Sequence, residues 1–248
     1  MRFSILGVPV DNLTVVELKE RVRQLGDDRL PHHIVTVNPE FIMAAQHDTE
    51  FRSILNRADL SVADGFGISL AARRLGQRLQ GRWTGVDMMI FLCELAASQN
   101  RSVFLLGAQP GVAEKTAAEL HRRFPGLHIV GAESGFRHWH RPFPLEKIID
   151  QINRKRPDYL FVAFGQVKQE KWIYQALPKL NSVKIAVGVG GAFDYVSGKI
   201  RRAPRWMRAV GLEWLFRLFR QPWRASRIFT AVVRFGLTVL RSAHHHSS

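Results

Sequence analysis

Short apolar runs alternate along the chain with stretches whose apolar positions recur at helical spacing. The runs have the length of strands, and their nearly continuous apolar character is typical of strands buried on both faces of a sheet. They are His33–Val37, Leu60–Ala63, Ser102–Leu106, His128–Val130, Tyr159–Phe164 and Lys184–Val189. Helices are predicted between them, at Phe41–Leu55, Val86–Gln99, Val112–Phe124, Leu145–Lys155 and Gln169–Leu177. This alternation predicts an α/β fold with a Rossmann-like, largely parallel sheet flanked by helices.

Charge divides the chain in a way that the hydrophobic pattern does not. Between Lys199 and Arg241 there are eleven Lys or Arg residues and one acid, Glu213, so this segment carries +10 of the net charge of +15. We therefore expect an α/β body at residues 1–198 and a basic, amphipathic C-terminal appendage at residues 199–241. Residues 242–248 include three histidines and are expected to be a disordered end or a tag.

The composition also bears on the cellular compartment. Cys93 is the single cysteine, so no intramolecular disulfide is possible and a reducing compartment is favoured. The first residues do not resemble a secretory signal, and no run of about 18 uncharged apolar residues is present. We expect a cytoplasmic protein, either soluble or bound to the inner leaflet of the membrane.

Two of the predicted strands end in polar residues that could face a ligand. Ligands of open parallel sheets bind at the carboxyl ends of strands. Asn38 precedes Pro39, and Asp64 precedes two glycines, Gly65 and Gly67. Each polar residue could simply cap the following helix. Alternatively, Asp64 could be a carboxylate at the mouth of a site, suited to general-base catalysis. Both interpretations stay open at this point.

Two further strands end in glycine-rich turns. Gly107 begins a turn that leads into a helix N-terminus, whose free N–H groups could bind a phosphate. Gly188–Asp194, which includes Gly190, resembles a dinucleotide fingerprint, but Phe193 replaces its third glycine. A Rossmann-type dehydrogenase is therefore excluded.

Several other chemistries have no matching motif. The chain lacks a His/Cys cluster with zinc spacing, a Gly-x-Ser-x-Gly elbow and an Asp-x-Asp pair. We expect neither a metal nor a cofactor. Phosphate groups would then be bound by arginine, lysine and helix ends.

The basic appendage combines cationic and large apolar residues. Trp206, Val210 and Trp214 recur at intervals of four, which predicts one helix, and Pro222 is placed to begin a second. Three interpretations compete: a docked helix pair with a solvated arginine face, a nucleic-acid-binding surface, and an interfacial membrane anchor. A membrane anchor uses both halves of the pattern, because apolar side chains enter the bilayer while arginines meet anionic head groups.

Taken together, these segments resemble the TagA/WecG/CpsF family of bacterial glycosyltransferases, glycosyltransferase family 26. The resemblance covers the chain from Ile5 to about Arg227. It is carried by the blocks Thr36–Glu40, Ala58–Leu60, Ala63–Gly67, Arg82–Asp87, Phe104–Gly107, Pro110–Ala113, Lys168–Trp172, Gly188–Asp194, Arg202–Pro204 and Gly211–Trp214. One departure is Val167, where the family commonly has proline.

The resemblance implies an inverting, metal-independent transfer from a UDP-sugar to an undecaprenyl-diphosphate-linked sugar, on the cytoplasmic face of the bacterial inner membrane. It assigns the general base to Asp64. Substrate-binding residues would be Thr36, Asn38, Arg82, Gly107, Gln169, Gly190 and Asp194. Lipid-diphosphate-binding residues would be Arg217, Arg224 and Arg227, where an arginine fork suits a diphosphate. The family further implies that the body self-associates away from the membrane.

The donor sugar and two rival functions stay open. The family includes users of UDP-N-acetylmannosamine, its uronic acid and UDP-glucose, and no residue decides among them. The rivals are a non-catalytic binding module at the membrane surface and, less favoured, a basic nucleic-acid-binding protein.

Overall fold

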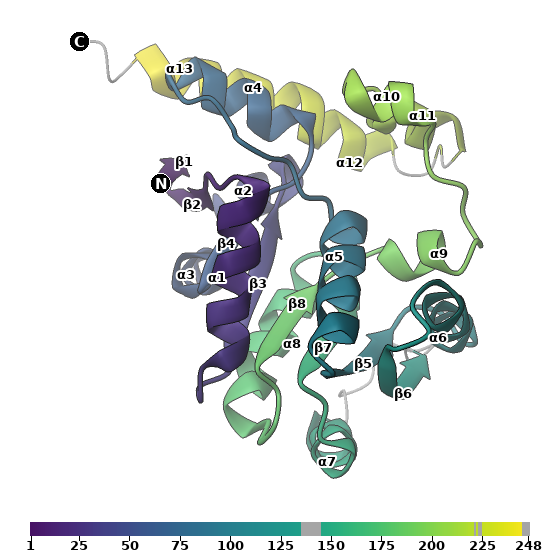
Figure 1. Ribbon diagram of the computed structural model, residues 1–248. Coiled ribbons are helices and arrows are strands. Elements are labelled where there is room, and N and C mark those ends of the chain that lie inside the picture. The colour runs from purple at the N-terminus through teal and green to yellow at the C-terminus, as the bar shows by residue number, and fades with distance from the viewer. Residues whose placement is uncertain (135–144, 221, 223–224, 245–248) are drawn as a thin grey trace.

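An eight-stranded sheet forms the centre of the molecule, for which the computed structural model describes residues 1–134, 145–220, 222 and 225–244. The strand order is β1-β2-β4-β3-β8-β7-β5-β6, and every neighbouring pair is parallel except the β1–β2 hairpin. The strands are β1 (Arg2–Ile5), β2 (Val8–Asp11), β3 (His32–Val37), β4 (Leu60–Ala63), β5 (Ser102–Gly107), β6 (His128–Ser134), β7 (Tyr159–Ala163) and β8 (Ile185–Gly188). The predicted α/β class is confirmed (Figure 1).

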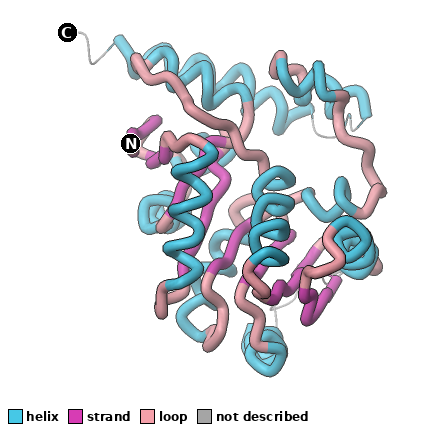
Figure 2. Tube along the Cα trace, in the orientation of Figure 1, coloured by secondary structure: helices cyan, strands magenta, loops and turns pink. Residues whose placement is uncertain are grey.

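Helices cover both faces of this sheet, as the tube view shows (Figure 2). One face packs against α1 (Val15–Asp27), α5 (Gly85–Ser98), α6 (Val112–Arg123) and α9 (Ala192–Val196). The other packs against α2 (Pro39–Ala45), α3 (Thr49–Arg57), α7 (Leu145–Lys155) and α8 (Lys168–Ala176), and a 3₁₀ turn, η1 (Leu177–Lys179), follows α8. Because alternate strand residues point to opposite faces, each strand contributes to both cores.

The hydrophobic pattern predicted the central strands well and the flanking elements less well. One helix was expected over Phe41–Leu55, but the chain forms α2 and α3 instead, because Asp48 accepts a hydrogen bond from the N–H of Phe51 and caps a new helix. The strand β6 is longer than expected. It is only half-buried, because it is the outermost strand and has a neighbour on one side alone. The pattern missed the β1–β2 hairpin, α1 and α4 (Phe66–Arg74).

The topology places the carboxyl ends of the parallel strands at one edge of the sheet. The strands β1 to β4 form one half of the sheet, and after β4 the chain crosses to β5 in the other half. The strands β3 and β8 are therefore neighbours in the middle of the sheet. The loop after β3 therefore opens at the place where the strand order reverses, with the loop after the neighbouring strand β4 beside it, and α/β proteins bind ligands at such places.

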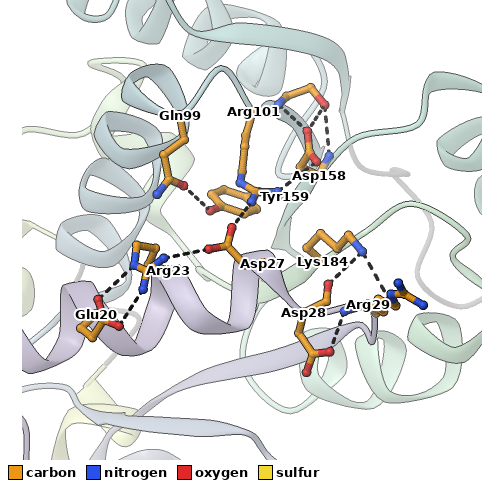
Figure 3. A network of polar contacts seen from close by, with 11 residues as sticks. Glu20, Arg23, Asp27, Asp28, Arg29, Gln99, Arg101, Asp158, Tyr159 and Lys184 are labelled. Atoms are coloured by element: carbon orange, nitrogen blue, oxygen red, sulfur yellow. Dashed lines mark hydrogen bonds and ion pairs between the residues drawn. The ribbon is translucent and has the colours of Figure 1, made fainter.

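A polar network ties together the opposite edge, where the strands begin (Figure 3). Arg101 donates to Asp27 at 2.6 Å and lies 3.5 Å from Asp158, whose carboxylate accepts from the backbone at the start of β5. Burial raises the pKa of Tyr159 to about 12, so its hydroxyl stays protonated and donates to Gln99. The hydrogen bonds and ion pairs at this end of the sheet connect protein residues to one another, which indicates a structural role.

The C-terminal segment lies across the carboxyl edge, beside α4 (Figure 1). It contains α10 (Arg205–Ala209), α11 (Glu213–Arg220), α12 (Ala225–Phe229), a π-helical turn η3 (Thr230–Arg234) and α13 (Phe235–His244). Phe235 and Val239 are 3% and 4% exposed and belong to the same apolar cluster as Phe41 and Ile68 of the body. The end of the chain is therefore partly built into the core.

One expectation for this segment is corrected. Trp206, Val210 and Trp214 do not share one helix, because Gly211 adopts a φ of +80° between α10 and α11 and ends the first helix there. Of the end predicted to be disordered or a tag, residues 242–244 form the last residues of α13, and residues 245–248 lie outside the described part of the chain, so that prediction stays open. In the described segments, none of the helices combines the length and the apolar character needed to cross a bilayer.

Candidate active site

A cavity of about 1030 Å³ lies between the carboxyl edge of the sheet and the C-terminal segment. The body contributes Asn38, Asp64, the first residues of α4, and the segment from Arg82 to Asp87. The C-terminal segment contributes residues from Arg202 to Trp214 and from Ala231 to Leu240. The basic segment is thus one wall of the cavity that holds the predicted base.

Asp64 occupies the turn between β4 and α4. Its backbone N–H donates to the carbonyl of Val37 at 2.7 Å, which continues the pairing of β4 with β3 by one residue. Gly65 then adopts a φ of +89°, a conformation that glycine allows, and the chain turns into α4. Gly65 is the N-cap of α4 and offers no side chain to cap it, and Asp64 lines the cavity.

Asn38 and Thr36 lie at the end of the neighbouring strand but differ in access. The side-chain oxygen of Asn38 accepts a hydrogen bond from the N–H of Phe41 at 2.9 Å and caps α2, while the residue also lines the cavity. Thr36 is 4% exposed within β3, opposite Val62, and is not part of the cavity lining. Asn38 and Asp64 therefore line the same cavity, whereas Thr36 is buried in β3 and does not.

Arg82 joins the body to the C-terminal segment. Its guanidinium lies 5.8 Å from the centroid of the Phe66 ring and donates to the carbonyl of Arg208 at 3.5 Å. A Cβ on Gly211 would lie 2.4 Å from the same ring, so the turn after α10 sits directly on Phe66. Arg82, Arg208 and Phe66 all line the cavity.

A second contact anchors the beginning of the C-terminal segment. Arg202 donates to both carboxylate oxygens of Asp87, at 2.7 and 2.9 Å, and to the hydroxyl of Thr84 at 2.9 Å. Burial alone would raise the pKa of Asp87, but the hydrogen bonds from Arg202 and Thr84 outweigh it and lower that pKa below the ordinary value. No role was predicted for Thr84, Asp87 or Arg202 from the sequence, where only the opposite charges of Asp87 and Arg202 could suggest the pairing.

Gln169 belongs to a buried network behind the glycine turn of β8. Its Oε1 accepts from the N–H of Gly190 at 3.0 Å, and its Nε2 donates to Glu170 at 2.9 Å. The other Glu170 oxygen lies 2.8 Å from Nε2 of His33, which is the donor because a carboxylate accepts. Gln169 is 2% exposed, so it holds the Gly190 turn in place from inside the protein.

The remaining candidate residues of the body lie along the same edge of the sheet but outside the cavity lining. Gly107 ends β5 with a φ of +114°, and a Cβ there would lie 2.8 Å from the backbone of Ala163. Asp194 lies on α9, 3.5 Å from Lys199 Nζ. Val167, at the start of α8, has a φ of +67°, an angle that the proline common at this position could not adopt.

The three arginines expected from the appendage can be placed only in part. Arg217 lies on α11 and Arg227 on α12, but their side chains, and Arg224 altogether, lie outside the described residues. Among the residues that are described, no group of three or more His, Cys, Asp or Glu side chains could hold a metal ion.

The carboxyl ends of parallel strands near a switch point are where α/β proteins bind ligands, and a basic wall favours an anionic ligand there. The family model for the glycosyl transferase WecG/TagA/CpsF family matches residues 3–248. The chain therefore belongs to this family and is a glycosyltransferase, as the resemblance implied.

Curated relatives share about a third of their residues with this chain. An N-acetylglucosaminyldiphosphoundecaprenol N-acetyl-beta-D-mannosaminyltransferase of Bacillus subtilis (strain 168) is 33% identical over 215 residues, which is 87% of this chain and 81% of the relative. Proteins with the same name from Staphylococcus aureus are 33% identical in strain MRSA252, over 87% of this chain and 84% of the relative, and 32% identical in strain MW2, over 92% and 88%.

Proposed function

We propose that this protein transfers an N-acetylmannosaminyl group from a UDP-sugar to N-acetylglucosaminyl-diphosphoundecaprenol, with inversion and without a metal. The observation that carries the proposal is the position of Asp64 in a cavity of which the basic C-terminal segment forms one wall. The names of the relatives support this donor and acceptor over the other two donor sugars that the sequence left open.

In the proposed reaction, Asp64 is the general base. It takes the proton from the acceptor hydroxyl as that oxygen forms a bond to C1 of the donor sugar, and the bond from C1 to the diphosphate breaks on the opposite face. UDP leaves with the bonding electron pair. Its negative charge is stabilised by cationic side chains, so one carboxylate suffices for a single displacement.

The other candidate residues are assigned by their placement. Asn38 and Arg82 line the cavity and are proposed to contact substrate. Gly107, Gly190 and Asp194 would serve the donor along the same edge of the sheet, with Gln169 positioning the Gly190 turn. Thr36 stays a predicted substrate-binding residue. Because it is buried, it would contact substrate through its backbone or after a small movement of the neighbouring loop. Arg217, Arg224 and Arg227 are proposed to bind the lipid diphosphate.

We further propose that the enzyme works as a peripheral protein on the cytoplasmic face of the inner membrane. The C-terminal segment exposes large apolar residues, among them Trp206, Phe219 and Phe229 at 64%, 79% and 55% exposure, alongside its arginines. Such a surface can insert into a bilayer while its cations meet anionic lipids. Self-association of the body away from the membrane remains a prediction.

A donor screen tests the proposed reaction. The protein would be supplied with a short-chain lipid-diphosphate N-acetylglucosamine acceptor, EDTA, and each of the three UDP-sugars in turn. UDP-N-acetylmannosamine should give the highest kcat/KM. Activity that vanishes with EDTA and returns with a divalent cation would contradict the metal-free mechanism, and transfer of glucose alone would contradict the donor.

The variant Asp64→Asn tests the base. The amide preserves the shape of the side chain but cannot take a proton, so kcat should fall about 10²- to 10⁴-fold while vesicle binding is retained. Unchanged turnover would overturn this assignment. Loss of turnover also separates the enzyme from a non-catalytic membrane module, and a nucleic-acid binder would show salt-sensitive DNA or RNA binding instead.

A further inference from the structure

The walls of the cavity differ in chemistry according to the elements that form them. The loops at the strand ends and the start of α5 contribute charged side chains, including Asp64, Arg82 and Asp87. The wall made by α4, η3 and α13 is mainly apolar, with Arg74 in the last turn of α4 as its charged member. The apolar side chains of this wall include Leu70, Ala71, Val232, Phe235, Val239 and Leu240.

The apolar wall runs from the core to the protein surface. Phe235 and Val239 are buried, and they join the wall to the core cluster of the body. Leu70 on α4 and Leu240 on α13 are 54% and 47% exposed, although both line the cavity. A cavity lined by charge near the base and by aliphatic side chains toward the surface suits a ligand that is itself polar at one end and aliphatic at the other.

A lipid-linked acceptor has this division, because its diphosphate is bonded directly to an isoprenoid chain. If the diphosphate lies among the cations near Asp64, the first isoprene units must leave along one of the cavity walls. Only contact with the apolar wall buries their surface without leaving polar groups unpaired. A purely electrostatic site at the membrane surface would not need such a wall.

We propose that the wall formed by α4, η3 and α13 is a subsite for the first isoprene units of the acceptor lipid. The inference rests on the proposed function and adds to it that the protein, as well as the bilayer, recognises the lipid. The C-terminal helix then has two contacts with lipid: its exposed residues meet the bilayer, and its cavity-lining residues hold the part of the acceptor nearest the reaction.

Chain-length dependence in the absence of any membrane tests this subsite. N-acetylglucosamine diphosphate esters with an ethyl group and with a farnesyl group would be compared in vesicle-free, detergent-free solution. The farnesyl ester should have a KM at least about tenfold lower, because its apolar carbons are buried on the protein. Equal KM values in the wild-type protein would overturn the proposal.

Two double variants test whether the chain-length dependence of KM arises at the apolar wall. The double variant Leu70→Gln/Leu240→Gln changes one exposed aliphatic residue on each side of the apolar wall, and it should reduce the ratio of the two KM values at least fivefold. The control is Leu75→Gln/Leu237→Gln, which changes exposed leucines at the end of α4 and on α13 that do not line the cavity. The control should keep the wild-type ratio, and an equal loss in both pairs would refute the location.

A binding measurement separates failure of the subsite from failure of the proposed reaction. Farnesyl diphosphate alone would be titrated into the full-length protein by calorimetry. Binding that is weakened in Leu70→Gln/Leu240→Gln supports the subsite even if no sugar is transferred. Sugar transfer to the ethyl ester, with no binding of farnesyl diphosphate, would support the proposed reaction and refute the subsite.

Discussion

At the scale of single residues, the glycines and buried polar groups around β8 determine the shape of the turn that the donor is proposed to meet. A Cβ on Gly188 would lie 2.3 Å from Glu170 Oε1 and 2.4 Å from Gln169 Nε2. Both of those atoms already have hydrogen-bond partners in the interior. The glycine is therefore required by close packing of a polar network, and it would be required even without a role in binding phosphate.

The substitution Gly188→Ala should lower the free energy of unfolding by about 3 kcal/mol, because the added methyl group must displace a buried, paired side chain. Chemical denaturation would measure the change. Gly126→Ala is the matched control, since a Cβ there meets nothing within 4 Å. Equal stability of the two variants would show that the network can move aside.

The substitution Glu170→Gln tests the same network by changing its hydrogen-bonding groups while keeping the size of the side chain. The glutamine keeps the size but offers one acceptor where His33 and Gln169 need two, so stability should fall by about 2 kcal/mol. If Gln169 positions the Gly190 turn, the variant should also raise KM for the donor more than it lowers kcat. The exposed Glu119→Gln on α6 is the control and should leave the KM values unchanged. A fall in stability with unchanged donor KM would limit the network to a structural role.

At the scale of elements, α13 is both part of the core and a wall of the cavity. Phe235 packs with residues of α2 and α4, and a Cβ on Gly67 would lie 2.7 Å from Pro39 and 3.8 Å from the Phe235 ring. The turn at Gly211 and the Asp87–Arg202 pair fix the other end of the C-terminal segment on the body. These contacts give the segment a defined position over Asp64.

The variant Phe235→Ala should destabilise the protein by about 3 kcal/mol, because it leaves a cavity in the shared core. Hydrogen exchange should rise first in α13 and α4, because Phe235 of α13 packs in the same apolar cluster as residues of α4. Leu237→Ala, half-exposed on the same helix, should have a much smaller effect. Uniform exchange changes across the whole sheet would argue against α13 as the weakest-held element.

At the scale of the whole molecule, charge and exposed apolar surface gather on the side of the sheet where the site lies. The opposite edge is braced by internal ion pairs and carries no comparable basic segment among the described residues (Figure 3). The proposed membrane docking would make use of this polarity, because the surface proposed to meet the bilayer is also the one proposed to hold the acceptor.

The double variant Trp206→Ser/Phe219→Ser should weaken binding to anionic vesicles at least about tenfold, because two large side chains can no longer enter the bilayer. Vesicle sedimentation would measure the affinity, which should also fall as salt is added. The control is the double variant Val16→Ser/Leu30→Ser, which changes similarly exposed residues on α1 and in the loop after it. Unchanged affinity in Trp206→Ser/Phe219→Ser would contradict membrane docking through this face.

The sequence by itself determined the α/β class, the central strands and the position of Asp64 at a strand end, because buried strands and their turns have short, local signatures. It also determined the family, through blocks such as Arg82–Asp87 and Gly188–Asp194. The roles assigned to single residues in those blocks stay predictions.

Only the tertiary structure decided which residues meet across long separations. It divided one predicted helix at Asp48, ended another at Gly211, and placed Gln169 inside the protein in contact with Gly190. It also paired Asp87 with Arg202 and built Phe235 into the core of the body. Such contacts depend on how the sheet order brings distant segments together, and no local pattern of hydrophobic and polar positions encodes that order.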